Sequence, residues 1–159
     1  MRYLFGVSAP TTDSVAISMS WERRPGKSGL RESVDRSFPA LPSALYEVRK
    51  FIRDEAEGGG LSVSTTNDII LAVSEACANA VLHSGSTEMR VVWTQETDCV
   101  RVSIEDEGTF LKRVPIPELD RSHGHGIPLM MALMDEVSVR EGTERDPGTI
   151  VRLVKCRNR

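Results

Sequence analysis

The chain has 159 residues, of which 40% are hydrophobic and 27% charged, so it is long enough for one domain with one core. Its net charge is -3 and its 20 Lys and Arg residues form no basic run, which argues against a direct nucleic-acid binder. No apolar run approaches the roughly 20 residues that cross a bilayer. We therefore expect a cytoplasmic protein without a membrane role.

The first part of the chain differs in composition from the rest. Residues 1–35 are rich in charge, Pro, Gly and Ser and show little periodicity. We expect an N-terminal extension there, peripheral or flexible, in which Val15–Met19 could add an edge strand. Residues 36–156 are expected to form the folded domain.

Two helices are predicted next. The first has apolar residues at helical spacing from Leu45 to Ile52, with Ser43 as a plausible N-cap and Gly58–Gly60 as a stop. The second runs from Ser64 to Ser84 and closes at a glycine.

Alternating apolar residues predict two hairpins, separated by a long loop and a short helix. The order of two helices, a hairpin, a loop, a short helix and a second hairpin predicts an α+β two-layer sandwich. Its sheet would be mixed but largely antiparallel, with helices covering one face. The first hairpin comprises 88–96 and 99–105, the loop 108–126 would act as a lid, the helix spans 127–134, and the second hairpin comprises 136–141 and 149–155.

Three cysteines, Cys77, Cys99 and Cys156, lie in apolar or alternating segments without CxxC spacing. Small buried thiols are expected rather than redox or metal-binding groups.

The second helix carries a narrow polar stripe on an otherwise apolar surface. Glu75, Asn79 and His83 are four residues apart, so they stack along one side, and Ala72 and Ala76 flank them. A thin solvated face is the plain interpretation. However, such a face usually carries long charged side chains, whereas small neighbours let a ligand approach. A carboxylate and an amide one turn apart can orient a water or hydrated Mg²⁺.

Two further segments carry weaker signals. Asp106 ends a strand, where a carboxylate can accept a hydrogen bond from an amino group such as that of adenine, and Gly108 lets the backbone turn close to a ligand. Thr149 places a hydroxyl at the start of the last strand. Taken alone, each segment is explained by ordinary turn or hairpin chemistry.

A two-glycine turn, Gly124 and Gly126, enters the helix that starts near Ile127. Free N–H groups and the helix dipole favour an anion at such a start, so a phosphate site is indicated, with a simple loop as the alternative. His123 and His125 have no convincing partner ligands, so a metal there is not expected.

Taken in order, four segments resemble the ATP-binding boxes of the GHKL superfamily, and more narrowly the anti-sigma factor serine kinases of the RsbW and SpoIIAB type. The segments are SEACANAVLH, EDEG, GHGIPLMMALMDEV and GTIVRL, and the resemblance covers roughly Ser37 to Lys155. It implies a Bergerat-type ATP-binding fold with ATP and Mg²⁺ as ligands.

The resemblance also implies a role for each matching residue. Asn79 would bind Mg²⁺ and Glu75 would act as general base, while His83 would assist with the phosphates. Asp106 would bind the adenine amino group with Gly108 beside it, and Thr149 would support the adenine pocket. The turn Gly124–Ile127, with His125 between its glycines, would border the phosphates.

The family further implies a serine/threonine-protein kinase that phosphorylates an anti-anti-sigma (STAS) partner, binds a sigma factor and forms a homodimer. A non-catalytic ATP-binding module is the alternative, which the presence of Glu75 disfavours. A sensor histidine kinase domain is also disfavoured, because no long dimerisation and phosphoacceptor segment is evident. The sequence departs from the family where Thr109, instead of another glycine, follows Gly108, and in its long N-terminal extension.

Overall fold

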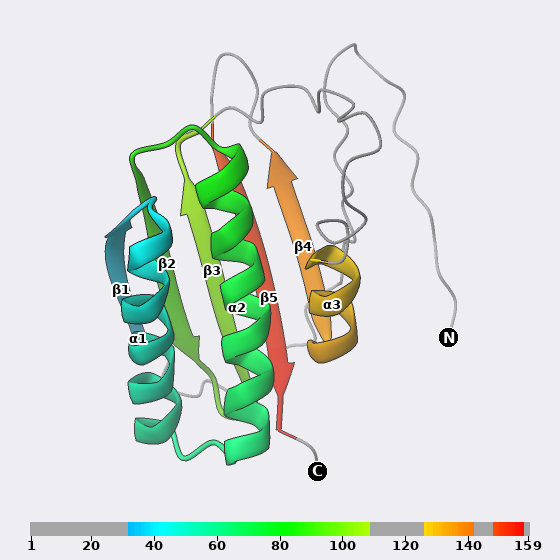
Figure 1. Ribbon diagram of the computed structural model, residues 1–159. Helices are drawn as coiled ribbons and strands as arrows, with labels where there is room; N and C mark the ends of the chain where they lie inside the picture. The colour runs from blue at the N-terminus through cyan, green and yellow to red at the C-terminus, as the bar shows by residue number, and fades with distance from the viewer. Residues whose placement is uncertain (1–31, 109–125, 142–147, 158–159) are drawn as a thin grey trace, which may run out of the picture.

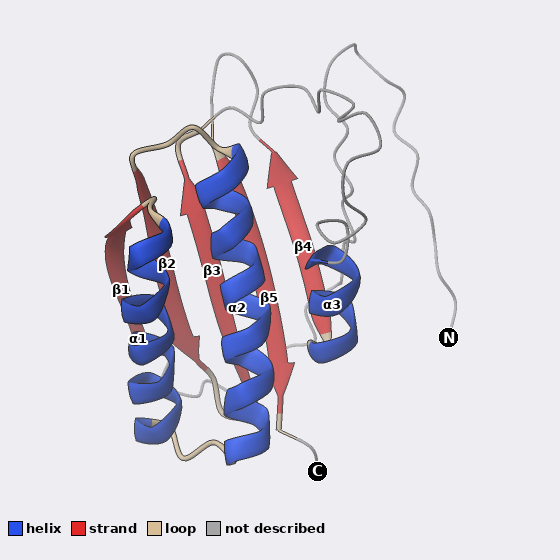
Figure 2. Cartoon of the chain, in the orientation of Figure 1, coloured by secondary structure: helices blue, strands red, loops and turns tan. Residues whose placement is uncertain are grey.

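The computed structural model describes residues 32–108, 126–141 and 148–157. In that part of the chain, five strands form one sheet and three α-helices lie over one of its faces (Figure 1). Figure 2 shows the two layers, with the helices in front of the sheet. The elements are β1 (Glu32–Pro39), a 3-10 turn (Pro42–Ala44), α1 (Leu45–Gly58), α2 (Val63–His83), β2 (Glu88–Gln95), β3 (Cys99–Asp106), α3 (Gly126–Leu133), β4 (Glu136–Glu141) and β5 (Thr149–Cys156).

The sheet has the order β1-β2-β3-β5-β4, and each of these pairings is antiparallel. Both predicted hairpins are present as adjacent pairs, β2 with β3 and β4 with β5. Because β5 lies between β3 and β4, the second hairpin joins the first through the β3–β5 pairing. The predicted α+β sandwich with helices on one face is confirmed, although the described strands form an antiparallel rather than a mixed sheet.

The core lies between the helices and the sheet. α2 turns the predicted apolar face towards the strands, and alternate residues of β2, β3 and β5 face it. Burial of each large side chain contributes about 1.5–3 kcal/mol to folding. The largest fully buried side chains include Ile69 and Val73 from α2 and Val91, Trp93, Val102, Ile104 and Leu153 from the sheet.

Among the described residues, no helix is both long and apolar enough to span a membrane.

The two long helices begin differently. Ser62 caps α2, since its hydroxyl oxygen accepts a hydrogen bond from the Thr65 N–H at 3.1 Å. The prediction that Ser43 caps α1 was wrong. Pro42 opens a 3-10 turn that contains Ser43 and runs directly into the helix, and the Leu45 N–H bonds the Pro42 carbonyl. The 3-10 turn therefore supplies an acceptor for a backbone N–H group at the helix start, which a side-chain cap would otherwise have accepted from.

β1 was not predicted from the sequence. It pairs with β2 from Glu32 opposite Gln95 to Pro39 opposite Glu88. Of its described side chains only Phe38 is buried. Polar character is typical of an edge strand, whose outer side faces solvent. The edge strand considered at Val15–Met19 lies outside the described residues.

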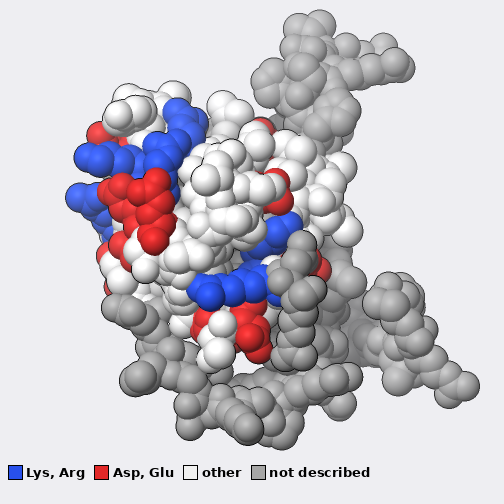
Figure 3. Space-filling model, turned by 90° about the horizontal axis from the view of Figure 1, so that it is seen from below, with Lys and Arg blue, Asp and Glu red and all other residues white. Residues whose placement is uncertain are grey.

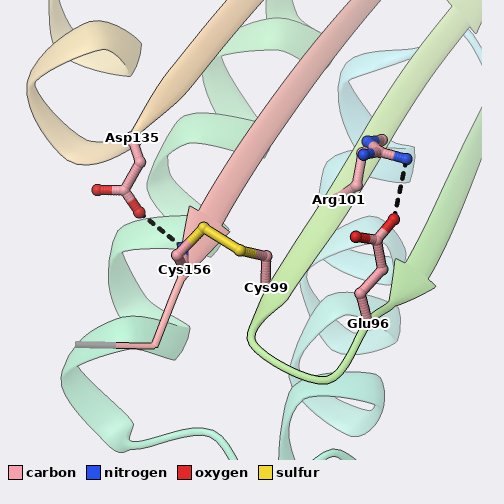
Figure 4. The surroundings of a disulfide bond; sticks show 5 residues. All are labelled: Glu96, Cys99, Arg101, Asp135 and Cys156. Carbon is pink, nitrogen blue, oxygen red and sulfur yellow. Dashed lines mark hydrogen bonds and ion pairs between the residues drawn. A yellow bond between two sulfur atoms is a disulfide. The ribbon is translucent and has the colours of Figure 1, made fainter. Parts of the chain in front are cut away.

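The expectation of three free thiols was wrong for two cysteines. Cys99 and Cys156 are direct partners across β3 and β5 and form a disulfide on the face of the sheet away from the helices (Figure 4). Their pairing depends on the β3–β5 adjacency, which joins positions 57 residues apart. Cys77 is a buried thiol, as expected, and burial raises its pKa to about 12.

Candidate functional site

The polar stripe of α2 lies on the side of the helix that faces α3. Glu75 and Asn79 are half-buried, whereas the neighbouring Ala72 and Ala76 are fully buried. His83, the last residue of α2, is exposed one turn beyond Asn79. The two central members of the stripe are therefore neither core residues nor a fully solvated surface.

The start of α3 lies directly against this stripe. A Cβ atom placed on Gly126 would lie 3.3 Å from both the Glu75 Oε2 atom and the Asn79 Nδ2 atom. Such contacts are tighter than ordinary van der Waals packing, so glycine keeps space open between the helix start and the two polar side chains. The first N–H groups of a helix lack intrahelical acceptors, and the dipole adds positive potential there. An anion fits this position.

Asp106 ends β3 in a buried position, with 8% of its surface exposed. Its carboxylate accepts hydrogen bonds from the backbone N–H of Gly108, at 3.0 Å, and from that of Thr149. Burial raises the pKa of Asp106, while these two hydrogen bonds act in the opposite direction. A carboxylate has about four acceptor positions, so unused acceptor capacity remains for a ligand donor.

Thr149 stands opposite Asp106 at the start of β5 and is 2% exposed. Its Oγ1 atom is buried and has no hydrogen-bond partner among the described residues. An unpartnered buried hydroxyl costs about 1–3 kcal/mol. The hydroxyl is therefore available for a polar atom of a ligand that also reaches Asp106.

Two glycines allow the chain to close around Asp106. A Cβ atom on Gly108 would overlap the Ser84 carbonyl at the end of α2, so the segment after β3 packs directly on that helix end. Gly148 has a φ of 131° and lies under the Asp106 carbonyl, where a Cβ atom would come within 2.8 Å of the oxygen. Ser84 was not predicted as a site residue, and Gly148 was predicted only as part of the GTIVRL segment, because only the tertiary packing brings the two residues next to Asp106 and Gly108.

The described part of the chain thus brings most of the predicted site residues together in two groups. Glu75, Asn79 and Gly126 meet at the α2–α3 contact, and Asp106, Gly108 and Thr149 meet at the ends of β3 and β5. Ile127 follows Gly126 in α3 and is 42% exposed. Gly124 and His125 lie outside the described residues. Among those residues, no group of three or more His, Cys, Asp or Glu side chains is placed to hold a metal ion.

Comparison with known proteins identifies the group to which this arrangement belongs. The family model described as histidine kinase-like ATPase domain matches residues 38–155. The chain belongs to the histidine kinase-like ATPase family. The resemblance to the GHKL superfamily, and within it to the RsbW and anti-sigma factor group, is confirmed.

Relatives within the family carry regulatory names. The chain is 29% identical over 143 residues to the serine-protein kinase RsbW of Bacillus licheniformis, covering 79% of this chain and 86% of that protein. It is 33% identical over 110 residues to the anti-sigma F factor of Clostridium perfringens, covering 61% of this chain and 76% of that protein.

Two solved structures share the fold. The crystal structure of the RsbU and RsbW domains of a Mycobacterium tuberculosis protein has a TM-score of 0.63 and 25% identity, and covers 79% of this chain but 32% of that longer chain. The SiaB–SiaC complex of Pseudomonas aeruginosa contains the same fold, with a TM-score of 0.57 at 14% identity.

Membership in an ATPase family agrees with the chemistry of the site residues. The orphaned hydroxyl of Thr149 and the acceptor oxygens of Asp106 suit a purine base with an exocyclic amino group. The gap that Gly126 leaves beside Asn79 and Glu75 suits phosphates and a hydrated cation, since an amide oxygen is a ligand that Mg²⁺ accepts. The residues present therefore fit ATP and Mg²⁺.

Proposed function

We propose that this protein is a serine/threonine-protein kinase that uses ATP to phosphorylate an anti-anti-sigma (STAS) partner and, in its other state, restrains a sigma factor. The observation that carries the proposal is the approach of Gly126 to both Glu75 and Asn79. The Asp106–Thr149 pair at the ends of β3 and β5 would complete the site. The names of its relatives, serine-protein kinase and anti-sigma factor, support it.

The adenine base would bind at Asp106 and Thr149. The Asp106 carboxylate is already oriented by two backbone N–H donors, so it can accept the adenine amino hydrogen without reorganising. The Thr149 hydroxyl would gain the hydrogen bond that it lacks. Gly108 and Gly148 would keep the backbone close to the base on either side.

The phosphates would bind at the start of α3. Gly126 and Ile127 would direct backbone N–H groups at them, together with Gly124 and His125, and the α3 dipole would favour their charge. Asn79 would hold Mg²⁺ through its amide oxygen, and His83 would add a donor one turn further along α2. Mg²⁺ held there would supply positive charge that offsets the negative charge of the phosphates during transfer.

Glu75 would act on the substrate hydroxyl. It lies one turn before Asn79 and beside Gly126, at the phosphate end of the site. As the serine or threonine oxygen bonds to the γ-phosphorus, its proton passes to the Glu75 carboxylate, and the bond from the γ-phosphorus to the ADP oxygen breaks. Phosphoryl transfer depends mainly on positioning and charge stabilisation, so this set of groups suffices.

A non-catalytic ATP-binding module that binds a protein partner is the second candidate. Mg-ATP binding by calorimetry tests what the two proposals share. Asn79→Ala should weaken binding by roughly 10-fold or more, whereas Asn67→Ala, an exposed asparagine of the same helix, should not. If Asn79→Ala bound Mg-ATP as tightly as the wild type, the proposed site would be wrong.

The surface charge bears on the kind of partner that the protein binds. Figure 3 views the molecule from the end where α1 stops and α2 begins, and there acidic and basic side chains lie interspersed rather than forming a basic surface. We propose that the partners are proteins, with no direct contact to nucleic acid or to a membrane. A homodimer and a cytoplasmic location are proposed as well. We also propose that the chain divides into an N-terminal extension of residues 1–35 and a domain of residues 36–156. Residues 32–35 of the extension form the start of β1.

A further inference from the structure

Lys155 makes a contact that no assigned role explains. It lies near the end of β5, on the same face as the buried Leu153, and its side chain is only 17% exposed. Its Nζ atom donates a hydrogen bond to the Leu133 carbonyl oxygen at 2.6 Å and lies 3.2 Å from the Asp68 Oδ2 atom. One ammonium group therefore joins β5, α3 and α2.

Both partners of Lys155 belong to the helices that carry the phosphate end of the proposed site. Leu133 is the last residue of α3, where backbone carbonyls lack intrahelical donors and the dipole favours a cation. Asp68 lies two turns before Glu75 on α2, and a seven-residue step returns to nearly the same side of a helix. Lys155 thus ties the end of α3 to the edge of α2 that carries Glu75 and Asn79.

α3 depends on such an anchor. It has eight residues, and a helix of this length is not stable on its own. Met130 is the only residue of α3 that is fully buried. The junction after α3 is also held by β5, through the Asp135 N–H to the Val154 carbonyl at 2.9 Å and the Cys156 N–H to the Asp135 carboxylate at 2.6 Å. Of these links, the Lys155 side chain alone reaches α2.

We propose that Lys155 is a positioning residue for the phosphate end of the site. By fixing the end of α3 against α2, it sets the position of the helix start, where Gly126 meets Glu75 and Asn79. An eight-residue helix is about 12 Å long, so Lys155 acts through α3 without touching the nucleotide. The inference rests on the proposed function, and it goes further by separating phosphate affinity from base affinity.

The test compares two ligands on three variants. Adenosine reaches only the Asp106–Thr149 end, whereas ADP with Mg²⁺ also needs the start of α3. Lys155→Met should weaken ADP binding roughly 10-fold, because small displacements of a binding group are costly, while adenosine affinity should stay the same. Lys155→Arg should restore most ADP affinity, since a guanidinium can serve both partners. Arg152→Met is the matched control, an exposed residue of the same strand that points to the other face.

Hydrogen exchange gives a readout that needs no nucleotide. Amides in the last turn of α3 should exchange faster in Lys155→Met than in Arg152→Met. Unchanged ADP affinity in Lys155→Met, or an equal loss for adenosine and ADP, would overturn the inference while leaving the proposed function intact. Wild-type protein that bound neither ligand would contradict the proposed function itself, and the inference with it.

Discussion

Asp106 and Thr149 face each other across the β3–β5 pairing, 8% and 2% exposed respectively, and the carboxylate of one accepts a hydrogen bond from the backbone N–H of the other. The pair exists only because the second hairpin docks on the first. The residue that ends β3 and the residue that begins β5, 43 positions later in the sequence, therefore lie side by side. The Thr149 hydroxyl remains unpartnered there among the described residues.

Replacing the Thr149 hydroxyl should change the stability of the fold and the affinity for ATP in opposite directions. Thr149→Val removes a buried polar group without a partner, so the free energy of unfolding of the nucleotide-free protein should rise by about 1 kcal/mol. ATP affinity should fall, because the base loses a hydrogen bond. Denaturant unfolding and calorimetry measure the two effects. Thr87→Val, at an exposed position, should change neither, and a parallel loss of stability and affinity in Thr149→Val would contradict the assignment.

The pKa of Asp106 predicts a pH-dependent stability. Burial favours the protonated form, so the folded-state pKa lies above the ordinary value of 3.8 and the folded state binds the proton more tightly than the unfolded state. The resulting stabilisation is complete below pH 3.8 and is lost as the pH rises through the folded-state pKa. Asp106→Asn, which cannot ionise, should therefore unfold at a higher temperature than wild type at neutral pH, with the gap closing in acid.

The control for this prediction is Glu105→Gln, the preceding residue, which faces the other side of the sheet and pairs with Arg90 at the surface. It should not reproduce the pH-dependent gap. A gap between wild type and Asp106→Asn that widened towards acid would show that the carboxylate is stabilised in its charged form, opposite to the prediction.

Gly126→Ala should weaken Mg-ATP binding without destabilising the fold. Its methyl group would enter the space beside Glu75 and Asn79, at 3.3 Å from each. Alanine also favours helix over glycine by up to about 1 kcal/mol, so thermal stability should hold or rise. Gly58→Ala offers a matched control, since it lies at the end of α1 with nothing within 4 Å of its added Cβ atom. Equal ATP affinity in Gly126→Ala and wild type would exclude the α3 start as the phosphate site.

Thiol counting tests the cysteine assignment. Protein oxidised in air should show no reactive thiol while folded and one after unfolding, because Cys77 is buried with a pKa of about 12 and the other two are joined. Reduction before unfolding should raise the count to three, the state that a reducing cytoplasm favours. Three thiols in the unfolded, unreduced protein would contradict the Cys99–Cys156 disulfide.

Much of this fold was predictable because its elements carry strong periodicity. The apolar face of α2 and the alternation in β3 are local patterns, and they predicted these elements to within one or two residues. β1 was missed because an edge strand buries little, and Phe38 is the only buried side chain described in it. Its existence depends on the free edge of β2, which no local pattern reveals.

The site was predictable in its residues but not in its geometry. Spacing on one helix placed Glu75 and Asn79 together, yet their contact with Gly126 depends on how α3 packs on α2. The same is true of Gly108 on Ser84, and of Cys99 with Cys156, which become neighbours only when β5 inserts between β3 and β4. Contacts of this kind arise from strand order and helix docking, which single-sequence patterns do not determine.

The proposed kinase activity is tested most directly by incubating the protein with radiolabelled ATP, Mg²⁺ and purified STAS-domain proteins from the same cells. Wild type should transfer label to a serine or threonine of one of them. Glu75→Gln should bind Mg-ATP with similar affinity but lose transfer by roughly 100-fold or more, the range expected for removal of a general base. Glu57→Gln, an exposed residue of α1, should behave as wild type. Label transfer that survived in Glu75→Gln, or Mg-ATP binding without any transfer by wild type, would contradict the proposal.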